Sequence, residues 1–109
     1  MNTLILPDPI AAYFAADQLG ADAIARCFTT QAVVKDESHT YAGLDAIKTW
    51  KAAASAAYTY TSAPFALEQK EGSSIVTSRV TGNFPGSPVN LRFFFELEGD
   101  RIALLEIIP

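Results

Sequence analysis

Cysteine, histidine and basic residues are scarce in this chain of 109 residues, and each scarcity excludes a class of protein. The single cysteine, Cys27, cannot form an internal disulfide, which excludes a secreted scaffold held together by disulfides. With one histidine, His39, and no Cys, Asp or Glu cluster at ligand spacing, we expect no metal site. Eight Lys and Arg against twelve Asp and Glu give a net charge of −4, so we expect no nucleic-acid partner.

Long apolar runs and cofactor motifs are also missing. No apolar run approaches the roughly 20 residues that a spanning helix needs, so we expect no membrane partner. The N-terminal stretch is apolar, but no Lys or Arg precedes it and Pro7-Asp8-Pro9 interrupts it, unlike a signal peptide. Phosphate-binding loops and dinucleotide fingerprints are absent, so we expect no cofactor. A Gly-x-Ser-x-Gly elbow is also absent, so a serine hydrolase has no support. These absences together favour a cytoplasmic protein.

The residues that are present predict one α+β domain over 1–109, because half of them are hydrophobic and the length suits a single core. Apolar spacing and turn residues predict helices over about 8–20, from Asp22 to Phe28, and over 44–57. A short strand is expected at 32–36 and a polar loop at 37–43. Residues rich in Thr, Ser, Val and Phe then predict strands at 58–69, 74–84, 89–97 and 101–108. Helices followed by hairpins predict helices on one face of an antiparallel sheet.

Two turns predict the register of the last strands. The turn at Gly99 places Leu97 opposite Ile102, and therefore Phe93 opposite Glu106. The turn at 85–88 places Phe84 opposite Val89, and therefore Val80 opposite Phe93. The core face is then expected to carry Val76, Val80, Leu91, Phe93, Phe95, Ile102, Leu104 and Ile108. The other face carries Arg79, Thr81, Asn83, Asn90, Arg92, Phe94, Glu96, Leu105 and Ile107. Since this second face is apolar at its centre, we expect it to form a homodimer interface.

The order of several motifs resembles a known family. The chain has a helix containing Tyr13-Phe14, a short helix ending in Phe28, and then Ala-Val-Val-Lys-Asp at 32–36. Tyr-Ala-Gly-Leu-Asp-Ala-Ile-Lys-Thr-Trp follows at 41–50, and the segment 82–102 is similar to the last two strands of that family. Over nearly its whole length the chain resembles the nuclear-transport-factor-2-like superfamily, and its SnoaL-like branch in particular.

The resemblance implies a cone-shaped, curved antiparallel sheet packed on three N-terminal helices, which is the cystatin-like roll. It also implies a pocket for a small apolar molecule and a homodimer formed through the sheet face. Members of the superfamily include polyketide cyclases, ketosteroid isomerases, epoxide hydrolases and dehydratases, so the fold leaves the function open.

Three residues are candidates for catalysis. Asp36 stands where the resembling isomerases and cyclases place their general base, although an Asp at a strand end also commonly bonds nearby backbone amides. Tyr13 matches the position of the tyrosine that donates to the oxyanion in ketosteroid isomerases, and core packing is an equal alternative. His39 is a possible acid–base partner, or an exposed loop residue without a role.

Five more residues are candidates for substrate binding: Phe14, Tyr41, Trp50, Phe93 and Glu106. The aromatic side chains suit an apolar pocket, and plain core packing explains each of them as well. Glu106 either lines the pocket or, if the register is shifted by one residue, lies at the surface or interface near Arg79 or Arg92. The isomerases also carry a neutral carboxylic acid on the penultimate strand, where this chain has Arg92 or Phe93. Neither side chain can replace that acid.

Two hypotheses for the function follow. In the first, the protein is a cofactor-independent isomerase or cyclase in which Asp36 removes a proton from a small apolar carbonyl compound. Tyr13 or His39 would then stabilise the oxygen that becomes negative. In the second, the protein is a ligand-binding or dimerisation module that keeps the pocket without the chemistry, as the missing carboxylic acid suggests.

Overall fold

Helices and strands in the computed structural model, which describes residues 4–109, largely follow the predicted boundaries. The elements are α1 (Asp8–Ala16), α2 (Ala21–Ala25), β1 (Phe28–Asp36), β2 (His39–Ala42), α3 (Leu44–Ala57), β3 (Tyr60–Lys70), β4 (Ser73–Gly82), β5 (Val89–Glu98) and β6 (Arg101–Ile108). The third helix has the predicted bounds, whereas the first two are shorter than predicted. The expected polar loop at 37–43 is wrong, since most of it forms β2, which makes a hairpin with β1.

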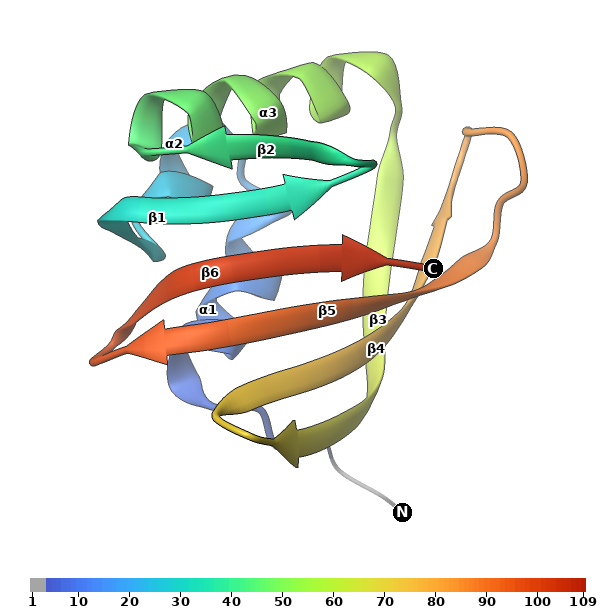
Figure 1. Ribbon diagram of the computed structural model, residues 1–109. Helices are drawn as coiled ribbons and strands as arrows, with labels where there is room; N and C mark the ends of the chain where they lie inside the picture. The colour runs from blue at the N-terminus through green and yellow to red at the C-terminus, as the bar shows by residue number, and fades with distance from the viewer. Residues whose placement is uncertain (1–3) are drawn as a thin grey trace.

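The six strands form one curved, open sheet in the order β2-β1-β6-β5-β4-β3. Neighbouring strands are antiparallel except β1 and β6, a parallel pair that hairpin patterns alone do not predict. α1 lies behind the sheet and α3 runs beside β2, so the helices cover the concave face and leave the convex face open (Figure 1). The α+β roll predicted from the sequence is confirmed. No helix within residues 4–109 is long and apolar enough to cross a membrane.

The core lies between α1 and the concave face and is rich in aromatic rings. Ile10 and Tyr13 are buried on one side of α1, as the helical spacing predicts. The Tyr13 ring makes edge contacts with Phe95 at 5.4 Å and with Phe28 at 6.1 Å between centroids. Such edge-to-face pairs contribute about 0.5–1.5 kcal/mol beyond the burial of their area. They fix α1 against the sheet and thereby position one wall of the site.

The faces of β4 and β5 are those predicted, although their register differs. Val80 pairs with Val89 rather than with Phe93, and Val76 pairs with Phe93. The connection between the strands is therefore longer than a tight turn at 85–88. The observed register is shifted from the predicted one by an even number of residues, so each side chain stays on its predicted face.

A β-bulge in β6 reverses the predicted faces at its C-terminal end. Leu97 pairs with Ile102 as predicted, but the next pair is Glu96 with Leu104, which leaves Ala103 as an extra residue. Leu105 and Ile107 therefore lie inside, and Leu104 and Ile108 lie on the convex face, the reverse of the prediction. Phe93 pairs with Ile107, and Glu106 pairs with Phe94. The predicted place of Glu106 on the core face is wrong, and the alternative of a surface position is correct, since its side chain is exposed.

The long edge strand β3 is interrupted near its middle. Pro64 pairs with Ser78 and Ala66 with Thr77, so Phe65 is an extra residue in a second bulge. The Phe65 side chain is 55% exposed. Before this bulge, Tyr60 and Ser62 point to the concave face, where the cavity lies.

Candidate functional site

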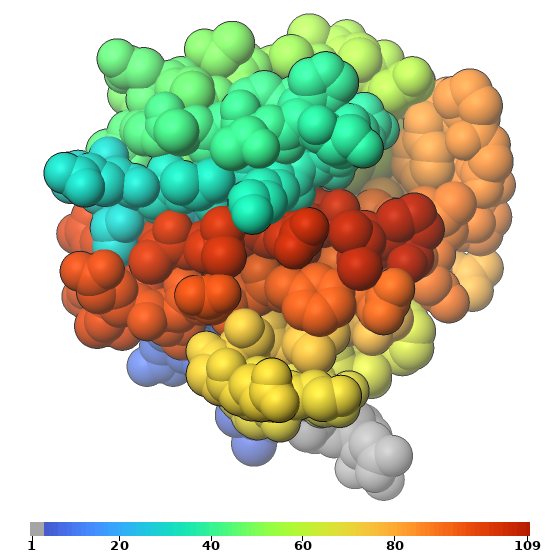
Figure 2. All heavy atoms as spheres, in the orientation of Figure 1, coloured from blue at the N-terminus to red at the C-terminus, as the bar shows by residue number. Residues whose placement is uncertain are grey.

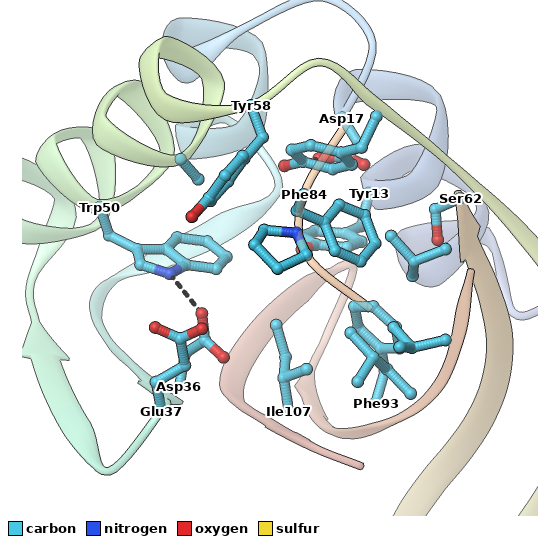
Figure 3. A pocket seen from close by; sticks show the side chains of 16 residues that line it. Tyr13, Asp17, Asp36, Glu37, Trp50, Tyr58, Ser62, Phe84, Phe93 and Ile107 are labelled. Carbon is cyan, nitrogen blue, oxygen red and sulfur yellow. Dashed lines mark hydrogen bonds between the residues drawn. The ribbon is translucent and has the colours of Figure 1, made fainter. Parts of the chain in front are cut away.

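A cavity of about 490 Å³ lies between the helices and the concave face of the sheet. That volume suits a ligand of two or three fused rings, since small-molecule sites commonly measure 300–1,000 Å³. The walls are mostly apolar and come from several elements: Tyr13, Trp50, Ala54, Tyr58, Tyr60, Val80, Phe84, Pro85, Val89, Leu91, Phe93 and Ile107. Four polar side chains interrupt them: Asp17, Asp36, Glu37 and Ser62. Figure 3 shows many of these side chains converging on the space.

Asp36 is held at one end of the cavity by Trp50. The carboxylate ends β1, and Trp50 Nε1 donates a 3.0 Å hydrogen bond to its Oδ2 (Figure 3). Burial raises the pKa of Asp36, and the nearby Glu37 charge adds to the rise, while the hydrogen bond from Trp50 offsets part of it. A raised pKa makes the carboxylate a stronger base than an exposed aspartate. A backbone hydrogen bond from Glu37 also offsets part of the rise, and no other side chain among residues 4–109 donates to the carboxylate.

Tyr13 points from α1 into the same cavity and is only 3% exposed. Its hydroxyl makes no hydrogen bond within residues 4–109, yet no fully buried side-chain oxygen or nitrogen there lacks a partner. The hydroxyl must therefore reach the cavity itself. Burial raises the pKa of Tyr13 well above its ordinary value, with smaller contributions from the Asp17, Tyr60 and Asp36 charges. The phenol thus stays protonated and presents a free donor to whatever fills the cavity.

The structure brings four of the eight predicted site residues together at the cavity: Tyr13, Asp36, Trp50 and Phe93. The other four lie elsewhere. His39 is exposed in the β1–β2 hairpin, with Nδ1 hydrogen-bonded to the Glu37 backbone oxygen at 2.9 Å. Phe14 packs on Phe93 at 5.2 Å in the core. The Tyr41 ring lies near Trp50, with 6.2 Å between the ring centroids, and Glu106 lies on the convex face.

Sequence patterns missed a second polar group in the cavity wall. Lys51 on α3 is 2% exposed and forms a salt bridge and hydrogen bond with Asp17, whose side chain is 7% exposed. Lys51 Nζ also donates to Tyr60 Oη at 2.7 Å. Burial alone would lower the pKa of Lys51, but the bonds to Asp17 and Tyr60 outweigh it and leave the pKa above its ordinary value. One signal was present, since Lys51 follows Ile47 by four residues and so falls on the buried face of the helix.

Gly82 allows Tyr60 to reach this position. A Cβ atom on Gly82 would lie 2.4 Å from the Thr59 backbone oxygen and 2.7 Å from Tyr60 Cβ, both far below contact distance. Asn83 holds Thr59 in place beside Gly82 by two hydrogen bonds: its backbone N–H donates to the Thr59 backbone oxygen, and its Oδ1 accepts from the Thr59 N–H. The start of β3 is therefore fixed against the end of β4. Within the described residues, no group of three His, Cys, Asp or Glu side chains could hold a metal ion.

A curved sheet, three helices over its concave face and an apolar cavity between them define a cystatin-like roll with a small-molecule site. No protein-family model matches the chain, and no curated protein matches it. Among solved structures, protein SMa1630 of Sinorhizobium meliloti, named as a candidate polyketide cyclase, is 39% identical over 94% of this chain and 95% of that one, with a TM-score of 0.89. The chain belongs to the SnoaL-like branch of the nuclear-transport-factor-2-like superfamily.

Two more distant structures share the fold. A protein of Catenulispora acidiphila with a ketosteroid isomerase-like fold, solved with trimethylamine, is 17% identical over 96% of this chain and 87% of that one, with a TM-score of 0.84. SalBIII, an epoxide hydrolase/cyclase-like enzyme in pyran ring formation in salinomycin, is 20% identical over 92% and 86%, with a TM-score of 0.76. At these identities the likeness concerns the fold alone.

Proposed function

We propose that the protein is a cofactor-independent isomerase or cyclase that removes a proton next to the carbonyl group of a small apolar compound. The observation that carries this proposal is the pairing of a half-buried carboxylate, Asp36, with a phenol donor, Tyr13, in one apolar cavity. The name of the Sinorhizobium protein, a candidate polyketide cyclase, supports the same class of substrate.

The proposed reaction needs only one base and one donor. The Asp36 carboxylate takes a proton from the carbon beside the carbonyl, and the C–H electron pair moves to form an enolate. The Tyr13 hydroxyl donates a hydrogen bond to the enolate oxygen, where negative charge develops. In an isomerase, Asp36 returns the proton to another carbon of the enolate. In a cyclase, the enolate carbon attacks a second carbonyl of the same molecule, the C=O π electrons move to its oxygen, and that oxygen takes the proton from Asp36. Trp50 holds Asp36 in place throughout.

Asp36 can be tested by proton exchange, which needs no knowledge of the natural substrate. We expect the protein to accelerate exchange of the α-protons of 2-tetralone in deuterium oxide, followed by proton NMR. Asp36→Asn should lower the protein-catalysed rate by about 10²–10⁴, the usual contribution of a general base. Asp45→Asn, the same change at an exposed site on α3, should keep the wild-type rate. Equal rates for wild type and Asp36→Asn would exclude Asp36 as the base.

Tyr13 and His39 are separated by the same assay. Tyr13→Phe removes the only atom proposed to contact the enolate oxygen, so we expect the exchange rate to fall by about 10²–10³. The His39 ring is exposed and outside the cavity lining, so we expect His39→Ala to keep the rate. A large loss in His39→Ala with none in Tyr13→Phe would reverse the two roles.

A ligand-binding module without catalysis is the second candidate function, and the position of Phe93 favours it. Of the two β5 residues that could occupy the position of the isomerases' acid, Phe93 faces the cavity, while Arg92 is exposed on the convex face. The cavity therefore lacks the second carboxylic acid that the related isomerases carry there. Thermal stabilisation by apolar carbonyl compounds that persists in Asp36→Asn, with no exchange or turnover of any of them, would support this module.

We also propose a homodimer formed through the convex face of the sheet. No helix covers this face, and Figure 2 shows the side chains of β1, β6, β5 and β4 side by side across it. Phe94 lies at its centre between Ile75 and Glu106, and the bulge adds Leu104 and Ile108 in place of the predicted Leu105 and Ile107. A stable dimer needs about 800 Å² from each subunit, and we expect a face of four strands to supply it.

A further inference from the structure

The Asp17, Lys51 and Tyr60 side chains form a polar group in the cavity wall that the proposed proton transfer does not use. The Lys51 ammonium and the Asp17 carboxylate are almost completely buried, at 2% and 7% exposure. Two charges are costly to bury, and a merely structural pair is often replaced without loss by apolar side chains. Two members of the group, Asp17 and Tyr60, line the cavity. Their position makes contact with a ligand possible.

The hydrogen bonds of Tyr60 leave its hydroxyl proton without a strong acceptor in the described residues. Lys51 Nζ donates to the Tyr60 oxygen at 2.7 Å, so a lone pair of that oxygen is occupied by a cation. The only acceptor for the Tyr60 proton within residues 4–109 is Asp17 Oδ1, at 3.4 Å, which is long for an O–H···O bond. A phenol that accepts from an ammonium is a better donor, because the positive charge polarises its O–H bond. Burial raises the pKa of Tyr60, so the proton stays on the oxygen.

This polar group is separate from the Asp36 end of the cavity. Figure 3 shows Asp17 and Ser62 away from Asp36, with Tyr13 and Phe84 projecting between them. Two successive residues of α3 contact the two ends of the cavity, since Trp50 donates a hydrogen bond to Asp36 and Lys51 donates one to Asp17. The cavity thus has two polar ends and an apolar middle.

We propose that the Tyr60 hydroxyl, oriented and polarised by Lys51, is a second ligand-binding donor that recognises an oxygen atom remote from the reacting carbonyl. The ligand is accordingly a small apolar carbonyl compound of two or three rings with a hydroxyl or keto group at its far end. Identification of the reacting end rests on the proposed function, whereas recognition of the far oxygen depends only on binding. Tyr60 is a specificity-determining residue, and Lys51 is a positioning residue that acts through it.

Matched ligands test this proposal by binding alone. The probes are 2-tetralone and its 6-hydroxy and 7-hydroxy derivatives, which differ only in the far oxygen, with dissociation constants measured by NMR titration. We expect wild type to bind the better hydroxy compound about three- to tenfold more tightly than 2-tetralone, the usual gain from one neutral hydrogen bond. Tyr60→Phe should abolish this preference and leave the affinity for 2-tetralone unchanged. Tyr58→Phe removes another hydroxyl from the cavity wall and should retain the preference.

A second variant covers the possibility that Tyr60→Phe misfolds. Asp17→Asn combined with Lys51→Met removes both charges and the polarisation of Tyr60 together, and should reduce the preference to less than twofold. The proposal is overturned if wild type shows no preference, if it binds none of the three compounds at millimolar concentration, or if the preference survives in a folded Tyr60→Phe protein. Loss of α-proton exchange chemistry with the preference intact would instead remove the catalytic proposal and leave the second donor in place.

Discussion

Lys51→Met is the perturbation for which the structure gives the clearest magnitude. Methionine keeps most of the length of the side chain but removes the ammonium, so Asp17 remains buried without its partner. Breaking a buried ion pair from one side costs about 3–5 kcal/mol, because the remaining charge is neither solvated nor paired. The free energy of unfolding of native domains is about 5–15 kcal/mol, so this loss is a large part of the total stability. At about 4 °C per kcal/mol, Tm should fall by roughly 12–20 °C.

The matched control is Lys48→Met, three residues earlier on the same helix. Lys48 also pairs with an aspartate, Asp22, at 3.6 Å, but the two side chains are 45% and 83% exposed. Exposed ion pairs contribute about 0–1 kcal/mol to stability, so the free energy of unfolding of this variant should lie within about 1 kcal/mol of the wild-type value. Both variants make the same change of side chain on one helix. Their difference therefore measures the effect of burial.

Urea unfolding followed by fluorescence of Trp50, the single tryptophan, gives the free energies directly. Adding Asp17→Asn to Lys51→Met removes the unpaired charge, and we expect the double variant to recover to within about 2 kcal/mol of wild type. A loss below about 1 kcal/mol in Lys51→Met, or a double variant no more stable than the single one, would refute the reasoning. The pKa of Lys51 is raised in the folded protein, so its contribution should persist through neutral pH and decline only above the pKa of an exposed lysine.

Three further outcomes are expected. Burial raises the pKa of Asp36 in the folded protein, so the protein loses stability as pH rises from the ordinary carboxyl pKa to the raised pKa. Asp36→Asn should therefore have a higher Tm than wild type at neutral pH in thermal melts, and this gain should disappear in acid. Phe94→Glu should convert the proposed dimer to a monomer in sedimentation velocity at micromolar concentration, and a wild-type monomer would contradict the proposed interface. Leu105→Ala should cost about 2–5 kcal/mol in urea unfolding and Leu104→Ala less than about 1, whereas the reverse order would contradict the bulge at Ala103.

Elements with strong local signals were predictable from the sequence. The third helix was predicted at its observed bounds because its apolar residues recur at helical spacing after Gly43. The faces of β4 and β5 were predictable because Leu91, Phe93 and Phe95 recur at every second residue, and the even shift in register kept Val76 and Val80 on the same face as Phe93. The first hairpin was missed, since β2 lies at the sheet edge and its polar sequence is also typical of a loop.

Features that depend on one inserted residue or on distant partners could not be predicted. Leu104 and Leu105 are both apolar, so the pattern does not show which of them faces the core, and the bulge at Ala103 decides it. Asp36 and Trp50 are 14 residues apart and were each singled out, although their hydrogen bond was not. Lys51 and Asp17 are 34 residues apart, and only the folded chain brings the Lys51 side chain on α3 to the residue that follows α1.

The bulge at Phe65 also affects how the edge of the sheet avoids pairing with a neighbouring molecule. An open sheet has two free edges, and β3, with 11 residues, is the longer of them. A long, regular edge offers a continuous row of unpaired backbone groups to a neighbouring molecule, which is a route to aggregation. Pro64 provides no N–H group, and the bulge beside it breaks the alternation of donors and acceptors along the edge. This interruption makes pairing along the edge unfavourable, which agrees with the proposal that two copies meet through the convex face instead.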